Sequence, residues 1–139
     1  MARILLLIAC GPCEPLVGWY DGTISGDVDG NVEVEVVAVD ETTIEITGFW
    51  SPVGLARTGD PNFTATRTCA EHDTVSTVEY AETWEDLTRG GWERWIGSAT
   101  FKFDRQGMTG GYFFDIETGP TEADLVAQEQ IAGTWEAIP

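Results

Sequence analysis

The sequence predicts an all-β domain of about eight antiparallel strands, arranged as an up-and-down barrel, with one short helix near the C-terminus. A two-sheet sandwich is the alternative. Short runs that alternate apolar and polar residues recur at near-even spacing, and turn residues close each run. The chain has 139 residues, which suits a single domain. With 42% apolar and 22% charged residues, the composition is that of a globular protein.

The N-terminal half carries the clearest strand patterns. A kinked first strand is expected over 18–25. In the next strand, 31–39, valines alternate with glutamates, which is typical of a strand with one buried and one wet face. Asp29-Gly30 between the two strands favours a type I′ hairpin turn, which needs positive φ at both central positions. A third strand is expected over 43–50.

A long loop over 51–61 separates these strands from the others. Further strands are predicted at 62–70, 74–84, 92–103 and 108–116. In the strand 92–103, Trp95, Ala99 and Phe103 share one face. The tail changes character. Thr121 and Asp124 have the spacing of a helix capping box, and Gly133 stands where a C-cap glycine belongs, so a helix followed by a last strand over 134–138 is expected.

The first ten residues have the layout of a short export signal. Arg3 is the only charge, and an apolar run follows it up to Cys10. The run Leu7-Ile8-Ala9-Cys10 resembles the lipobox of bacterial lipoproteins. That resemblance implies cleavage before Cys10, acylation of its thiol, and attachment to the bacterial cell envelope; secretion is the alternative. The chain then divides into a signal peptide over 1–9, an extended tether over 10–17 and the barrel domain over 18–139.

The lipobox resemblance also bears on the odd number of cysteines. If Cys10 carries lipid, Cys13 and Cys69 remain as a pair that an oxidising compartment would let bridge. Cys10 and Cys13 also match C-x-x-C, but no helix or second motif accompanies them, so redox or zinc chemistry is not favoured. A different interpretation stays open, in which residues 3–9 form a buried strand of a cytosolic domain with Cys10 as a core thiol.

The net charge argues against several partners. It is −17, from 24 acidic and 7 basic residues. A field of this sign repels phosphate, so nucleic-acid binding is not expected. The expected partners are a membrane, reached through the lipid, and a protein partner or a small apolar ligand.

Catalytic and metal-binding motifs are not expected. The chain has one histidine, His72, in a polar turn, and no G-x-S-x-G elbow. The stretch 27–31 has its glycine at the wrong position for an EF-hand loop. The sequence therefore predicts a protein that is not an enzyme, with no cofactor and no metal.

Aromatic residues are the strongest hint of binding. Trp84, Trp92 and Trp95 lie near Gly90-Gly91 at one end of a predicted hairpin, and Tyr112 is expected on the inner face of a later strand. An eight-stranded barrel has room for side chains or one small ligand. The strand count and Gly18-Trp19 resemble the lipocalin (calycin) layout, which implies an apolar-ligand site. The leading hypothesis is an exported, lipid-anchored, non-enzymatic barrel with a structural or interaction role; a small-ligand-binding barrel is the alternative.

Overall fold

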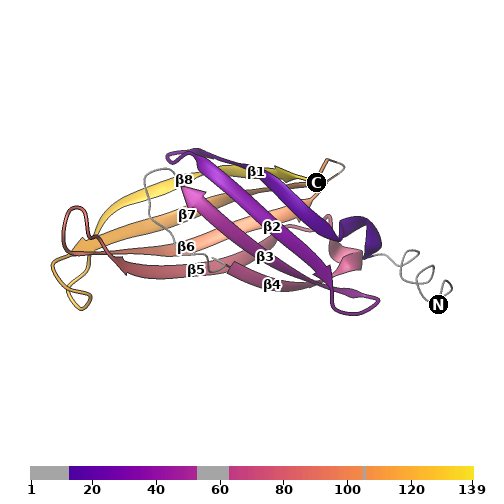
Figure 1. The fold of residues 1–139 in the computed structure, drawn as a ribbon, viewed down its shortest axis with the longest axis horizontal. Coiled ribbons are helices and arrows are strands. Elements are labelled where there is room, and N and C mark those ends of the chain that lie inside the picture. The colour runs from indigo at the N-terminus through magenta and orange to yellow at the C-terminus, as the bar shows by residue number, and fades with distance from the viewer. Residues whose placement is uncertain (1–12, 53–62, 105) are drawn as a thin grey trace.

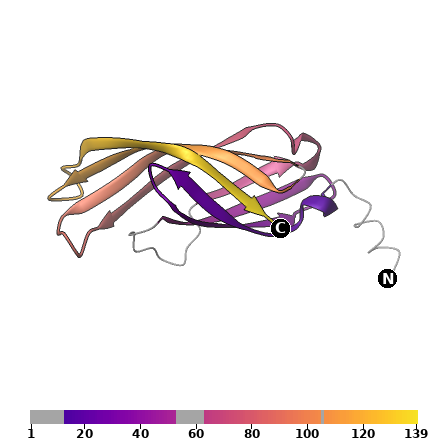
Figure 2. The ribbon, with the colours of Figure 1, turned by 90° about the horizontal axis from the view of Figure 1, so that it is seen from above.

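The computed structural model describes residues 13–52, 63–104 and 106–139, and their strands form one antiparallel sheet that curls into a nearly closed barrel (Figure 1; Figure 2). Two single-turn 3₁₀ helices, η1 (Glu14–Leu16) and η2 (Cys69–Glu71), flank β1 and β5. Neither is long or apolar enough to cross a membrane. The eight strands are β1 (Gly18–Gly26), β2 (Gly30–Ala38), β3 (Thr43–Pro52), β4 (Phe63–Thr68), β5 (Ser76–Glu85), β6 (Trp92–Phe103), β7 (Met108–Gly119) and β8 (Val126–Ile138).

The strand order is that of an up-and-down barrel. The sheet runs β4-β3-β2-β1-β8-β7-β6-β5, so most strands pair with their neighbours in sequence, and the first strand pairs with the last. β4 and β5 form the two edges, and the described residues contain no backbone ladder between them. This confirms the barrel prediction over the sandwich. The opening between β4 and β5 is called the seam below.

The buried side chains follow the alternating patterns that the sequence predicts. Val32, Val34 and Val36 on β2 are at most 1% exposed, whereas the intervening glutamates reach the surface. On β6, Trp95 and Phe103 point inward. Successive side chains of a strand point to opposite faces, so closing the sheet brings all the inner faces together.

The two halves of the barrel differ in length. β5 to β8 are longer than β1, β2 and β4, and the β5–β6 and β7–β8 hairpins project beyond the β1–β2 turn (Figure 1). β8 begins at Val126 but pairs with β1 only from Gly133 onward. At the projecting end, β8 therefore has no pairing with β1. Trp84 and Trp95 lie at this end.

The predicted C-terminal helix is wrong. Residues 121–124 form a single turn, in which Asp124 N–H donates to the Thr121 carbonyl oxygen, and the strand β8 follows. The Thr121 hydroxyl does contact the Asp124 carboxylate at 3.0 Å, but no helix grows from that turn. Ile131 and Trp135 belong to a period-two face, and β8 finds hydrogen-bond partners on both sides in β1 and β7. Those two ladders outweigh the local preference.

The β1–β2 hairpin exists, but it is not a type I′ turn. No non-glycine residue in the described part of the chain has positive φ, so Asp29 cannot take the required conformation. Gly26 has φ of 118° and redirects the chain at the end of β1. Asp27 then ties the turn to β8, because its N–H donates to the Ala132 carbonyl oxygen and its carboxylate accepts the Ala132 N–H.

Gly133, which was expected to end a helix, lies within β8 and is closely surrounded by neighbouring atoms. A Cβ at this position would overlap the Ser25 carbonyl oxygen and the Tyr112 hydroxyl. We expect Gly133→Ala to lower the free energy of unfolding by about 1–3 kcal/mol, the usual cost of overpacking. Gly111→Ala is the matched control, since an added Cβ there comes no closer than 3.3 Å to a neighbour, and it should cost less. Urea denaturation followed by tryptophan fluorescence measures both, and equal stability of the two variants would contradict this packing.

Candidate functional site

The middle of the barrel is packed with aromatic side chains. Phe114 on β7 has no exposed surface, and its ring contacts those of Trp50, Tyr80, Trp95 and Tyr112 at centroid distances of 5.0–6.0 Å. These rings come from β3, β5, β6 and β7. The side chains that would line a ligand cavity at this level therefore contact one another instead.

Tyr112, predicted as a ligand-binding residue, has its hydroxyl engaged by the β1–β2 turn. The hydroxyl donates to the Ser25 carbonyl oxygen at 3.0 Å, with the Val28 carbonyl oxygen at 3.2 Å as a second acceptor, and it accepts the Val28 N–H at 3.3 Å. Burial raises the pKa of the Tyr112 phenol, since the charged form would lose its water. These hydrogen bonds of Tyr112 attach the β1–β2 turn to β7.

Trp84 and Trp95 do come together, at the projecting end of the barrel. Their ring centroids are 5.9 Å apart, with Trp95 buried and Trp84 half-buried. Glu82 lies opposite Trp95 in the β5–β6 register, and Glu93 lies opposite Trp84. The Trp95 indole N–H donates to Glu93 Oε1 at 3.1 Å, and the Tyr80 hydroxyl donates to Glu82. Both carboxylates act as hydrogen-bond acceptors here and hold the Trp95 indole and the Tyr80 phenol in position.

Trp92 is not part of that pair. It is an odd number of residues from Trp95, so it points to the outer face of β6. There it lines an open groove of about 590 Å³ between the β5–β6 and β7–β8 loops, together with Gly91, Gly119 and Pro120. The four predicted ligand-binding residues therefore divide among three places: the core, the projecting end and the outer surface.

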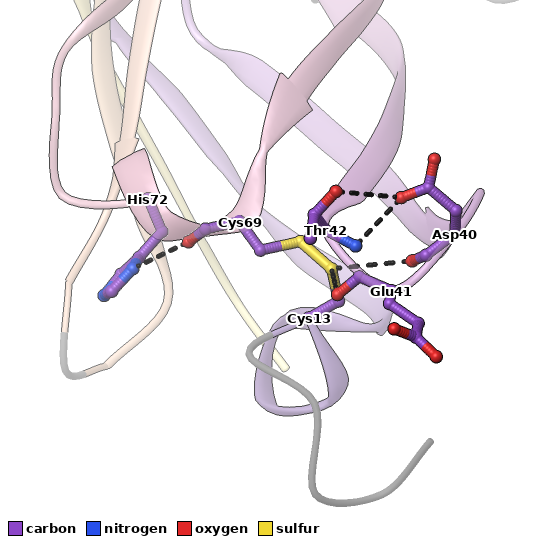
Figure 3. The surroundings of a disulfide bond; sticks show 6 residues. All are labelled: Cys13, Asp40, Glu41, Thr42, Cys69 and His72. Carbon is purple, nitrogen blue, oxygen red and sulfur yellow. Dashed lines mark hydrogen bonds between the residues drawn. A yellow bond between two sulfur atoms is a disulfide. The ribbon is translucent and has the colours of Figure 1, made fainter. Parts of the chain in front are cut away.

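A disulfide joins Cys13 to Cys69, as the sequence predicts (Figure 3). The two Cα atoms are 5.1 Å apart, and the bridge links positions 56 residues apart in sequence. Cys13 Sγ lies 3.4 Å from the Glu41 carbonyl oxygen, so the bridge also packs on the β2–β3 turn. In that turn, the Thr42 N–H donates to the Asp40 carboxylate and lowers the pKa of Asp40.

The segment before β1 is only partly a tether. Residues 1–12, which include the predicted signal peptide and Cys10, lie outside the described residues. The extended conformation predicted up to Leu16 is wrong for η1, where Leu16 is buried and its carbonyl oxygen accepts the Tyr20 hydroxyl at 2.8 Å. The described fold therefore includes Cys13 and η1 before the first strand, β1, which begins at Gly18.

Loss of the disulfide should destabilise the fold. The double variant Cys13→Ser/Cys69→Ser should unfold with a free energy lower by about 4 kcal/mol, because the unfolded chain regains the entropy of a long open loop. Denaturation in guanidinium chloride measures the difference. Cys10→Ser is the control and should match the wild type. Free thiols at Cys13 or Cys69 in the oxidised protein, found by alkylation and peptide mapping, would contradict the pairing.

Metal-ligating side chains do not cluster in the described part of the chain. It contains no group of three or more histidine, cysteine or acidic side chains placed to hold a metal ion. His72 Nδ1 donates to the Cys69 carbonyl oxygen at 3.1 Å, beside the disulfide (Figure 3).

One aromatic pair on the outside was missed by the sequence patterns. The ring centroids of Trp19 on β1 and Phe49 on β3 are 6.1 Å apart, on the outer face of the barrel. The sequence does contain this information. Trp19 and Tyr20 are adjacent in a strand, so only one of them can face the core.

The fold and these sites define an antiparallel eight-stranded barrel with an aromatic core. No protein-family model, curated protein or solved structure matches the chain.

Proposed function

We propose that this protein is an exported, lipid-anchored barrel with a non-enzymatic role, acting as an interaction domain through its outer surface. The observation that carries the interaction role is the packing of Phe114, which is fully buried among four other rings. A barrel filled at its middle offers its surface, rather than its interior, to a partner.

The disulfide supports the exported location. Bridges persist in oxidising compartments and are rare in the cytosol of most organisms. With Cys13 and Cys69 paired, Cys10 is the one remaining cysteine, and it ends the lipobox-like run. A bridge that fixes Cys13 to the barrel would place the lipid three residues from the folded domain. Such a protein would lie close to the membrane surface in the cell envelope.

A small apolar ligand is the second candidate, in the manner of a calycin barrel. It is favoured by the half-buried Trp84, which lies next to Trp95 at the projecting end. A ligand there would lie against the two indoles above the packed middle of the barrel.

Fluorescence titration separates the two candidates. We expect palmitate and 1-anilinonaphthalene to leave the tryptophan emission of the wild-type protein unchanged, because the rings around Phe114 occupy the interior. A saturable shift that is lost in Trp84→Phe but kept in the control variant Trp92→Phe would establish the calycin-like function in place of the proposed one.

Intact mass tests the anchor. When the full chain is expressed in a bacterium and recovered from membranes, we expect the mass of a protein that begins at Cys10 and carries a diacylglycerol group. Cys10→Ser is the control; it should lose both the lipid and the membrane association. A wild-type mass equal to the unmodified chain with Met1 present would refute lipidation.

A further inference from the structure

The outer face of β1–β3 carries an exposed aromatic pair. Trp19 is 51% exposed, and Phe49 lies against it with a tilt of 31° between the rings. The three strands lie side by side on one wall of the barrel (Figure 1). A large indole that is half in water, and supported from one side by another ring, offers a flat surface to a partner.

Carboxylates alternate with these rings across the same face. In the strand register, Glu35 lies opposite Trp19, and Glu33 lies between Asp21 on β1 and Phe49 on β3. Asp21 and Glu33 are both exposed. Like charges directly opposite each other on neighbouring strands destabilise the pairing. This face therefore has an electrostatic cost that a bound cation would relieve.

Among the described residues, β1, β2 and β3 carry no basic side chain of their own. The sequence contains no lysine or arginine between Ile4 and Ala56. The ion pairs found within the described ranges, Arg67–Glu71 and Arg94–Glu117, involve other strands. The described strands β1–β3 thus carry acidic side chains with no basic residue among them.

We propose that this outer face binds a basic segment of a partner protein. A lysine or arginine side chain has an apolar stem that packs along Trp19 and Phe49 and a charged head that reaches Glu33 and Glu35. A cation over the face of an indole ring adds a further attraction. The inference rests on the proposed function and names the partner chemistry of the interaction domain.

Other occupants fit this face less well. A second copy of the chain would bring two acidic walls together, at a net charge of −17 per copy. Anionic lipid headgroups and nucleic acids carry the same sign and would be repelled. A simple metal cation would use the carboxylates but leave the exposed rings without a contact. A basic protein segment uses both.

A peptide of known chemistry tests the proposal. A fluorescein-labelled dodecapeptide of alternating arginine and serine is titrated with the barrel, and binding is followed by anisotropy at low and high salt. Glu33→Gln/Glu35→Gln should weaken binding about fivefold or more, and Trp19→Ser about threefold. The glutamine substitutions should not lower the melting temperature, because they remove like-charge repulsion.

Matched controls remove the same groups elsewhere on the outer surface. Glu79→Gln/Asp115→Asn deletes two charges from β5 and β7, and Phe113→Ser deletes another aromatic ring, which is 47% exposed. Each should change the affinity by less than about twofold. Equal losses in the two double variants would overturn the proposal, because they indicate diffuse attraction of a polycation to an acidic protein.

The remaining outcomes distinguish a failure of this inference from a failure of the proposed function on which it rests. Absence of saturable peptide binding, with the emission still unchanged by apolar ligands, overturns the basic-segment inference alone. A saturable apolar ligand at Trp84 overturns the proposed interaction function itself. A peptide in which glutamine replaces arginine should not bind, and binding as tight as that of the arginine peptide would also overturn the proposal.

Discussion

The packing of rings around Phe114 is the interaction on which the barrel depends. Backbone hydrogen bonds join each strand to its neighbour except at the seam, where no ladder connects β4 to β5 in the described chain. Trp50 lies on the β4 side of the seam and Tyr80 on the β5 side, and their rings are stacked at 6.5 Å. Trp50 also contacts Phe114 edge-on. Side chains thus close the barrel where the backbone does not.

Such packing needs small residues beside the large ones. A Cβ at Gly48 would overlap the ring of Phe63, and one at Gly97 would overlap the backbone and ring of Phe114. The buried Cys13–Cys69 bridge constrains the end of the barrel near the β2–β3 turn, because it fixes the chain just after β4 to the segment just before β1. A core of this kind is rigid, since each ring is confined by its neighbours.

Strand positions could be predicted well from sequence because alternation is a local property. Valines that alternate with glutamates on β2 bury one face whatever the strand pairs with. The C-terminal helix failed because the capping-box signal at Thr121 is also local, while the ladders that convert 126–138 into a strand come from β1 and β7. For the candidate site, the odd sequence spacing between Trp92 and Trp95 is enough to place them on opposite faces of the strand. It could not indicate that Trp84 would meet Trp95, because that needs the register of the hairpin.

By itself, the sequence determined the β class, the buried face of most strands and the absence of lysine and arginine from residues 4–56, and the lipobox resemblance implied the pairing of Cys13 with Cys69. These follow from residue type and local period. Only the tertiary structure decided that β8 closes onto β1, that Tyr112 serves the β1–β2 turn, and that Trp19 meets Phe49 across an acidic wall. Each of these depends on the pairing and register of strands distant in sequence, which no local pattern encodes.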